Sequence, residues 1–247
     1  MGQNQDTHTS TMASSTVENY VKQLYLLGQE RPGELVTVGA VARVMCVAPG
    51  TATTMVKALS RAGLVRHFPR VGVRLTPSGE RLALQMLRKH RLIEMFLVQT
   101  LGLNWSEIHD EAERLEHALS ERLVERLDAF LGRPRVDPHG DPIPSAQGQI
   151  RARAAIPLTE LPEETEASIV RVTRQDAEFL RFLDSNGLQP GRNLRLLRRD
   201  PVADVLNITL DGGHKASLGG KAARHVLVEP AATNTSHKPS RKPPGKR

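Results

Sequence analysis

The sequence feature that most constrains the fold is the order of elements that residues 16–76 predict. Apolar residues recur there at helical spacing, and Pro and Gly residues mark where each element ends. The predicted elements are a helix (16–28), a short extended piece (35–38), a compact helical segment (39–44), a second helix (51–62) and two extended runs (64–68 and 71–76). Helix, turn, helix and then a β-hairpin is the order of a winged helix-turn-helix.

Small polar and basic side chains gather on this predicted unit. Threonines near a helix N-terminus can reach base edges and thymine methyl groups, and the helix N-terminus itself favours phosphate. Basic side chains further along the helix and in the hairpin would neutralise backbone phosphates. The predicted DNA-contacting residues are Pro49, Thr51, Thr53, Thr54, Lys57, Arg61, Arg66, His67, Arg70 and Arg74. The alternative is an ordinary α-hairpin followed by a solvated basic turn.

The composition is typical of a folded protein and is compatible with one that binds a polyanion. Of its 247 residues, 39% are hydrophobic and 25% charged, and the formal net charge is +7. A basic balance favours a polyanionic partner, although it does not specify a fold. A single cysteine, Cys46, excludes an intrachain disulfide framework. No run approaches the ~20 apolar residues of a membrane helix, and the polar N-terminus lacks an apolar signal core, so we expect a cytoplasmic protein without a membrane partner.

The rest of the chain predicts a helical region followed by a β-rich one. Helical spacing continues in runs at 77–101, 106–119 and 120–130, and the Pro- and Gly-dense stretch 138–148 marks a domain boundary. Strands are predicted at 170–172, 193–198, 205–210 and 225–228, which is typical of a small β-barrel-like domain.

A mainly α protein with three domains is therefore predicted. Its segments are a disordered N-terminal tail (1–14), the winged helix-turn-helix (15–76), a helical domain (77–147), a linker (148–166), the β domain (167–230) and a disordered basic tail (231–247). The basic tail either binds nucleic acid without sequence preference or is a solvated end.

Histidine and glutamate side chains converge in the helical region. His90 and Glu94 are four residues apart and share a face of their predicted helix. On the next predicted helix, four more fall within an arc of roughly 100°: His109, Glu113, Glu116 and His117. Imidazole with carboxylate suits Mn, Fe, Co, Ni or Zn, and no thiolate is present to favour a softer ion. Each residue alone would be read as a solvated surface group, but the set predicts a metal site.

Five stretches carry a resemblance to a known family: Thr16–Tyr20 (TVENY), the predicted winged helix-turn-helix, Arg88–Arg91 (RKHR), His109–His117 with its ExxEH ending, and Asp141–Pro144 (DPIP). On these the chain resembles the diphtheria-toxin-repressor and manganese-transport-regulator family of metal-dependent repressors, over about residues 15–230. The resemblance implies a homodimer that binds operator DNA when a divalent cation is bound, with residues 77–147 serving for dimerisation and metal binding. The β-rich end resembles the SH3-like third domain of the iron-type branch.

The resemblance also implies two metal sites. One would use Glu113, Glu116 and His117, completed from the first helix by Asn19 or Glu18. An ancillary site would use His90, Glu94 and His109, with Gln175 and Glu178 of the third domain able to reach it.

Three positions bear on which metal the chain binds. Glu113 stands where the iron-type branch has Cys and the manganese type has Glu, so an oxygen-rich site resembles the manganese type. Asn19 replaces the family's carboxylate or thioether, and Lys22 replaces a second carboxylate of the manganese type. An amide oxygen coordinates more weakly than a carboxylate, and a protonated lysine cannot coordinate. We therefore expect a first site that is weaker or reorganised. Mn²⁺ is expected first and Fe²⁺ next, with Zn²⁺, Co²⁺, Ni²⁺ or Cd²⁺ as substitutes in vitro.

Residues and resemblance together predict a metal-dependent transcriptional regulator, a repressor of metal-homeostasis genes rather than an enzyme. Two alternatives stay open. A winged-helix regulator of a non-metal ligand would bind DNA after complete chelation. A His/Glu metalloenzyme would need an open coordination position and a positioned base, and the sequence has no HExxH, GxSxG or nucleotide-binding glycine loop.

Overall fold

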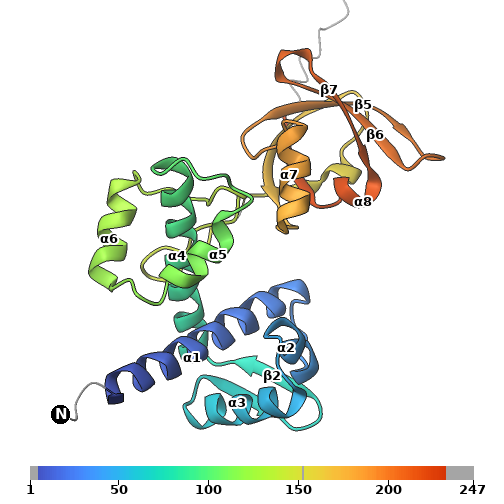
Figure 1. Ribbon diagram of the computed structural model, residues 1–247. Helices are drawn as coiled ribbons and strands as arrows, with labels where there is room; N and C mark the ends of the chain where they lie inside the picture. Colours follow the sequence, from blue (N-terminus) through green and yellow to red (C-terminus); the bar gives the residue numbers. More distant parts are fainter. Residues whose placement is uncertain (1–4, 152, 232–247) are drawn as a thin grey trace, which may run out of the picture. The chain divides into compact units, whose positions relative to one another are not determined.

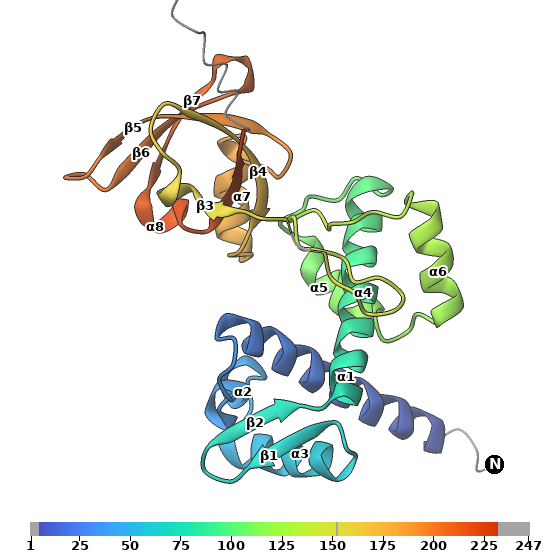
Figure 2. The ribbon, with the colours of Figure 1, turned by 180° about the vertical axis from the view of Figure 1, so that it is seen from behind.

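The computed structural model describes residues 5–151 and 153–231, and their side chains from Ser15 onward. The chain divides into two compact units, Met1–Ala152 with Gln175–Arg181, and Arg153–Arg174 with Phe182–Arg247. Figures 1 and 2 show the elements of each unit from opposite sides. The basic tail predicted for 231–247 lies outside the described residues from position 232 onward.

The N-terminal part of the first unit is a helix-turn-helix with a two-stranded wing. Its elements are α1 (Gln5–Glu30), α2 (Val38–Val44), α3 (Pro49–Arg61), β1 (Val65–Phe68) and β2 (Gly72–Leu75). The two strands of the wing pair antiparallel. Tyr20, Val21 and Leu24 of α1 share one buried core with Val56 and Leu59 of α3, so the apolar faces read from the sequence pack against each other.

Helix α1 begins earlier than the apolar pattern indicates. The pattern predicts a start at Thr16 after a disordered tail, whereas α1 begins at Gln5. The stretch QDTHTSTMAS is almost entirely polar, and a helix without an apolar stripe leaves no periodic signal. The extended piece predicted at 35–38 is a single bridge between Val36 and Val73.

Three helices complete the first unit: α4 (Pro77–Gln99), α5 (Ile108–Leu115) and α6 (Glu121–Phe130). The long helix α4 contacts α1, α5 and α6, and α1 crosses it in both views (Figures 1 and 2). Thr76 caps α4 by accepting a hydrogen bond from the Gly79 amide at 3.2 Å. A Cβ at Gly79 would collide with the carbonyl oxygen of Leu64, so glycine is required where the wing leads into α4.

The second unit is built on a six-stranded antiparallel sheet in the order β3-β8-β4-β5-β6-β7. Its strands are β3 (Ile156–Pro157), β4 (Thr165–Val172), β5 (Asn193–Asp200), β6 (Val205–Leu210), β7 (Lys215–Gly219) and β8 (Val226–Pro230). The remaining elements are η1 (Leu158–Glu160), η2 (Asp211–Gly213) and α8 (Gly220–Ala223). Helix α7 (Ala177–Ser185) begins in the stretch grouped with the first unit and ends in the second. Alternate residues of β6 are buried, as expected of a sheet with one face on the core.

The β domain differs from its prediction in closure and extent. Within the described residues, β3 and β7 lie at opposite edges of the sheet and do not pair with each other, so the sheet is open rather than a barrel. Strands β3 and β7 and helix α7 were not predicted. Leu158 and Leu161 lie in the predicted linker 148–166, yet both are 0% exposed. Their burial shows that the folded domain begins before residue 167.

Candidate metal centre and DNA-binding surface

The six predicted metal ligands lie on or next to two neighbouring helices of the first unit. His90 and Glu94 are on α4. The other four are on α5 or directly after it: His109, Glu113, Glu116 and His117. Helix α5 ends at Leu115 rather than at the predicted residue 119. Helix α1 adds further polar side chains to the same region, because Glu18, Asn19 and Lys22 share one of its faces.

A first group of ligand atoms forms around Glu94. Nε2 of His90 lies 3.0 Å from Oε1 of Glu94 and 3.2 Å from Nδ1 of His109. Oε1 of Glu94 is buried, and its contact with His90 is not aligned as a hydrogen bond. An imidazole nitrogen offers a lone pair once its proton is lost, so these two nitrogens and the carboxylate oxygen could coordinate one ion in place of the protons. Two imidazoles and a carboxylate fit a divalent transition metal ion, and the 56% exposure of the His109 side chain opens the group to solvent.

The electrostatics of this group also fit a cation. Burial alone would lower the pKa of His90, but the charge of Glu94 and the hydrogen bond with Glu116 outweigh it and raise this pKa to about 9. Burial would raise the pKa of Glu94, but the charge of His90 and the close approach of His109 lower it below its usual range. Without metal, a proton on His90 therefore balances the buried carboxylate.

A second group involves two residues that the sequence analysis did not propose, Asp137 and His139. With Glu94 they form a fully buried set whose ligand atoms lie within 4.8 Å of one another. Nε2 of His139 donates a hydrogen bond to the Trp105 carbonyl at 2.9 Å, and Nδ1 has no hydrogen-bond partner. That Nδ1 atom lies 4.0 Å from carboxylate oxygens of both Glu94 and Asp137. An imidazole nitrogen held free between two carboxylates again fits a metal ion.

The charge balance around Asp137 supports the same fit. Burial and repulsion from Asp141 and Glu94 raise the pKa of Asp137 well above its usual range, although Arg91 opposes this. A divalent cation would remove that repulsion. The only sequence signal is a histidine and two aspartates in the stretch DPHGD (137–141), most of which lies in the predicted domain boundary 138–148.

A third group, His90 with Glu113 and Glu116, does not fit a metal ion. Nζ of Lys22 lies 2.6 Å from Oε1 of Glu113 and 2.5 Å from Oε1 of Glu116. Nδ1 of His90 lies 2.7 Å from the other oxygen of Glu116. The carboxylates are close enough for a metal, but a lysine side chain already stands between them.

The remaining α1 residues lie near His117. Oε2 of Glu18 is 2.7 Å from Nδ1 of His117. Oδ1 of Asn19 and Nε2 of His117 are both buried without a hydrogen-bond partner, and that Nε2 atom lies 3.6 Å from Oε1 of Glu116. An amide oxygen and an imidazole nitrogen left unpaired in this way are plausible metal-ligand atoms.

Gln175 and Glu178, which the resemblance suggested, have different surroundings. Gln175 belongs to the stretch grouped with the first unit and donates its amide hydrogen to Asp141 at 2.8 Å. Glu178 is exposed on α7, and the converging ligand groups among the described residues do not include it.

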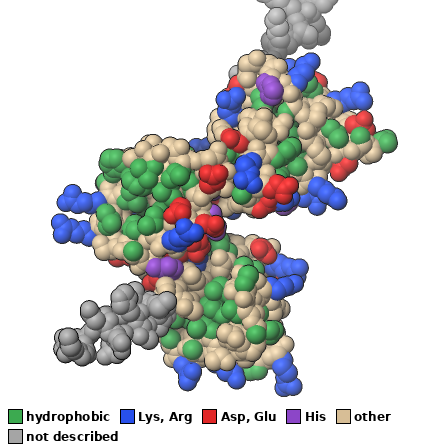
Figure 3. All heavy atoms as spheres, viewed as in Figure 1, with side chains coloured by type: hydrophobic (Ala, Val, Ile, Leu, Met, Phe, Trp, Pro, Cys, Tyr) green, Lys and Arg blue, Asp and Glu red, His purple; other side chains and the backbone are tan. Residues whose placement is uncertain are grey.

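The predicted DNA-contacting residues line α3 and the wing. All are exposed except Thr53 and His67, which are half-buried. Pro49 opens α3 as its first residue. The hydroxyls of Thr53 and Thr54 donate to backbone carbonyls one turn earlier, at 2.8 and 3.0 Å, which leaves their oxygens able to accept hydrogen bonds. Figure 3 shows Lys and Arg side chains projecting from this end of the first unit.

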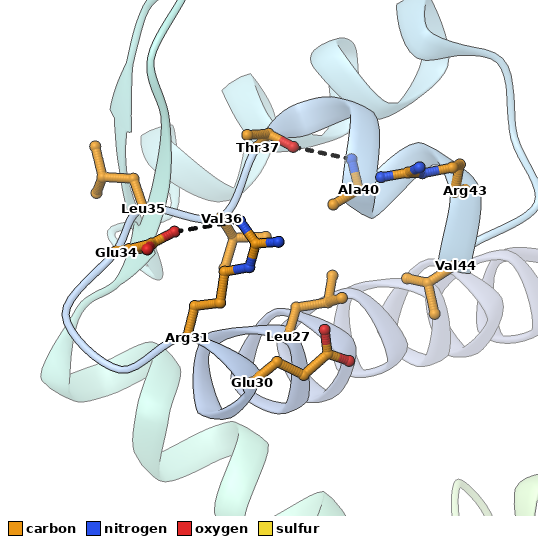
Figure 4. Close-up of a pocket in the computed structure, with 10 residues that line it drawn as sticks. All are labelled: Leu27, Glu30, Arg31, Glu34, Leu35, Val36, Thr37, Ala40, Arg43 and Val44. Atoms are coloured by element: carbon orange, nitrogen blue, oxygen red, sulfur yellow. Dashed lines mark hydrogen bonds and ion pairs between the residues drawn. The ribbon is translucent and has the colours of Figure 1, made fainter. Parts of the chain in front are cut away.

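A hollow on the DNA-binding domain, shown in Figure 4, is separate from the metal-ligand groups. It has a volume of about 490 Å³ and lies between the end of α1 and α2. Arg31 and Glu34 on its rim pair with each other at 3.6 Å, and the Thr37 hydroxyl accepts from the Ala40 amide at 3.2 Å. None of the predicted metal ligands or DNA-contacting residues lines it.

Comparison with known proteins assigns the three parts of the chain. Residues 12–73 match "Iron dependent repressor, N-terminal DNA binding domain", and residues 76–145 match "Iron dependent repressor, metal binding and dimerisation domain". Residues 156–230 match the FeoA domain. The iron-dependent repressor IdeR of Mycobacterium tuberculosis (strain ATCC 25618 / H37Rv) is 31% identical over 227 residues, which cover 87% of this chain and 96% of the relative. The chain belongs to the iron-dependent repressor family.

Solved structures of this family are similar along most of the chain. A "manganese-dependent transcriptional repressor complex with manganese" shares 39% identity at a TM-score of 0.78, covering 87% of this chain and 100% of that one. ScaR with bound Cd²⁺ shares 36% identity at a TM-score of 0.70, covering 86% and 98%. The protein is accordingly a metal-dependent, DNA-binding transcriptional repressor of this family, and not an enzyme. No helix in the described part of the chain is long and apolar enough to cross a membrane.

Proposed function

We propose that this repressor binds operator DNA when a divalent cation, Mn²⁺ in preference to Fe²⁺, is held at Glu94. The observation that carries the proposal is Oε1 of Glu94, which is buried and has no aligned hydrogen bond, beside the facing nitrogens of His90 and His109. The other oxygen of Glu94 faces His139 and Asp137, so one carboxylate can serve either group or bridge both. The carboxylates around Glu94 are buried and need positive charge nearby. A bound cation would supply the charge that protons on the neighbouring side chains otherwise provide.

Several observations support manganese as the preferred ion. The converging groups offer imidazole and carboxylate donors, and the one cysteine, Cys46, is exposed in the turn between α2 and α3. Hard oxygen donors with imidazole and without thiolate suit manganese and iron better than soft ions. Zn²⁺, Co²⁺, Ni²⁺ and Cd²⁺ would substitute in vitro, because the same imidazole and carboxylate donors also bind these ions.

The partners in this proposal are DNA and a second copy of the chain. The helical region matches a dimerisation domain, and its surface exposes large apolar side chains, among them Phe130 at 69% and Leu123 at 51% on α6. Figure 3 shows apolar side chains gathered over α6. Pairing two copies through this surface would place two recognition helices α3 on successive major-groove faces. The proposed repressor acts in the cytoplasm, and the genes that it represses are those of metal homeostasis.

In this proposal, metal binding and DNA binding are coupled through α1. This helix packs against α4, and its Glu18 side chain contacts His117. A cation shifts an equilibrium only by its different affinity for the two arrangements. Typical couplings are ~1–3 kcal/mol, or roughly 5- to 150-fold in DNA affinity.

Fluorescence anisotropy of a labelled operator fragment tests this function. The wild-type protein is titrated in EDTA and then in Mn²⁺, Fe²⁺ and Zn²⁺. DNA affinity should rise on adding Mn²⁺, and His109→Ala should remove most of that rise while leaving EDTA binding unchanged. His214→Ala, an exposed histidine of the second unit, is the matched control. Equal wild-type affinity with and without metal would leave a DNA-binding protein whose switch is not metal.

A further inference from the structure

Lys22, a basic residue in the middle of α1, is almost fully buried, at 2% exposure. Lysine is seldom buried unless it is paired, because removing an ammonium group from water is costly. Here the ammonium forms two short ion pairs, with Glu113 at 2.6 Å and Glu116 at 2.5 Å. Lys22 is thus a fixed charge within the anionic cluster and not a side chain that reaches solvent.

We propose that the Lys22 ammonium is a built-in cation that takes the place of a metal ion between Glu113, Glu116 and His90. This group therefore binds no metal, and α1 stays joined to the α5 region whether or not metal is bound elsewhere. The inference rests on the proposed function, since it limits how many ions the repressor senses.

The arrangement around Lys22 has the donors of a metal site. His90 offers Nδ1 to one oxygen of Glu116 at 2.7 Å, and Lys22 takes the other oxygen. The ligand atoms of His90, Glu113 and Glu116 lie within 4.8 Å of one another. A divalent ion placed among them would meet a like charge at short range, so it could bind only if the ammonium left. If the Lys22 ammonium left its two carboxylates, the lysine side chain would have to enter the packed interface between α1 and α4. An unpaired charge there is costly.

The ion pairs also carry a structural consequence. They connect α1, which begins the DNA-binding domain, with Glu113 on α5 and Glu116 just after it. A metal bridging these carboxylates to α1 would make such a connection only when bound. The lysine makes it permanently, so metal dependence has to come from the neighbouring Glu94 groups or from the unpaired atoms of Asn19 and His117.

Manganese stoichiometry of the full-length protein tests the inference without DNA. Equilibrium dialysis against Mn²⁺, followed by elemental analysis, counts bound ions per chain. Lys22→Glu replaces the ammonium with a carboxylate, and it should bind one more Mn²⁺ per chain than the wild type. Lys89→Glu makes the same charge change at a lysine paired with Glu121 on α6, and it should match the wild-type count. Equal counts for Lys22→Glu and wild type would overturn the inference. If circular dichroism shows that Lys22→Glu does not fold, Lys22→Met keeps the stem and should give the same gain at higher Mn²⁺.

A second measurement uses the wild-type protein alone. Lysine acetylation followed by mass spectrometry reports which ammonium groups are accessible. Lys22 should stay protected in EDTA and in saturating Mn²⁺, while the exposed Lys57 reacts in both. Mn²⁺-induced reactivity of Lys22 would mean that metal displaces the lysine, and the inference would be wrong. Absence of any metal effect on wild-type DNA binding would instead refute the proposed function, whatever the dialysis counts show.

Discussion

At the scale of single residues, the histidines and carboxylates around Glu94 and Glu116 are held together by ion pairs, one of them with the Lys22 ammonium. His90 illustrates this, because it contacts Glu94, Glu116 and His109 while only 6% exposed. Its pKa of about 9, against 6.5 for the free side chain, means that the folded, metal-free protein binds a proton there that the unfolded chain releases at lower pH.

A pH-dependent stability of the metal-free protein follows. Because the pKa of His90 is raised by folding, its stabilising contribution is complete below pH 6.5 and is lost as the pH rises towards 9. The loss is at most about 3 kcal/mol, which corresponds to several degrees in Tm. Thermal denaturation in EDTA from pH 6 to 9 measures it, and His90→Gln should flatten the dependence. A wild-type Tm that is constant across this range would contradict the assignment.

At the scale of elements, sequence periodicity located helices well and loops poorly. The spacing of His90, Glu94, His109 and Glu113 follows from helical geometry, so their convergence could be predicted without a structure. Asp137 and His139 could not, since they lie in a Pro- and Gly-rich loop whose burial depends on Trp105 stacking on His139 at a ring-centroid distance of 5.6 Å.

The ion pairs of Lys22 could not be predicted from sequence periodicity either. The sequence places Lys22 on the first helix, and the resemblance marks this residue as a departure from the manganese type. The pairing depends on how α1 packs against the α4–α5 region, and tertiary packing of this kind has no sequence period. The β domain shows the same limit at the edge strand β3, which has only two residues and so cannot show an alternation.

The junction between the wing and α4 offers a test at this scale. Gly79→Ala would place a Cβ against the backbone carbonyl of Leu64, which cannot rotate away. We expect a loss of ~1–3 kcal/mol in the free energy of unfolding. Gly39→Ala is the control, because a Cβ on that helical glycine meets nothing within 4 Å and should be neutral or slightly stabilising. Urea denaturation of both variants decides the matter, and equal stabilities would mean that the close approach at Gly79 is not a constraint.

At the scale of the whole molecule, we expect different side chains of the repressor to give affinity for DNA and preference for its sequence. Phosphate contacts give affinity that falls with salt and carries no sequence information, whereas contacts to base edges specify the site. Arg70, at the tip of the wing, is exposed, and Thr54 lies exposed in the first turns of α3. We therefore expect replacement of Arg70 to lower the affinity for any DNA, and replacement of Thr54 to lower the preference for operator.

Binding to operator and to unrelated DNA, each over a range of salt concentrations in saturating Mn²⁺, distinguishes the two roles. Arg70→Gln should weaken binding to both DNAs alike and reduce the slope of log affinity against log salt by about 1. Thr54→Ala should leave that slope unchanged while lowering the preference for operator by ~1–3 kcal/mol, equivalent to roughly 5- to 150-fold. Arg224→Gln removes the same charge from the second unit, where Arg224 is exposed, and should alter neither quantity. A salt slope that falls for Arg224→Gln as much as for Arg70→Gln would mean that net charge, and not the wing, sets the affinity.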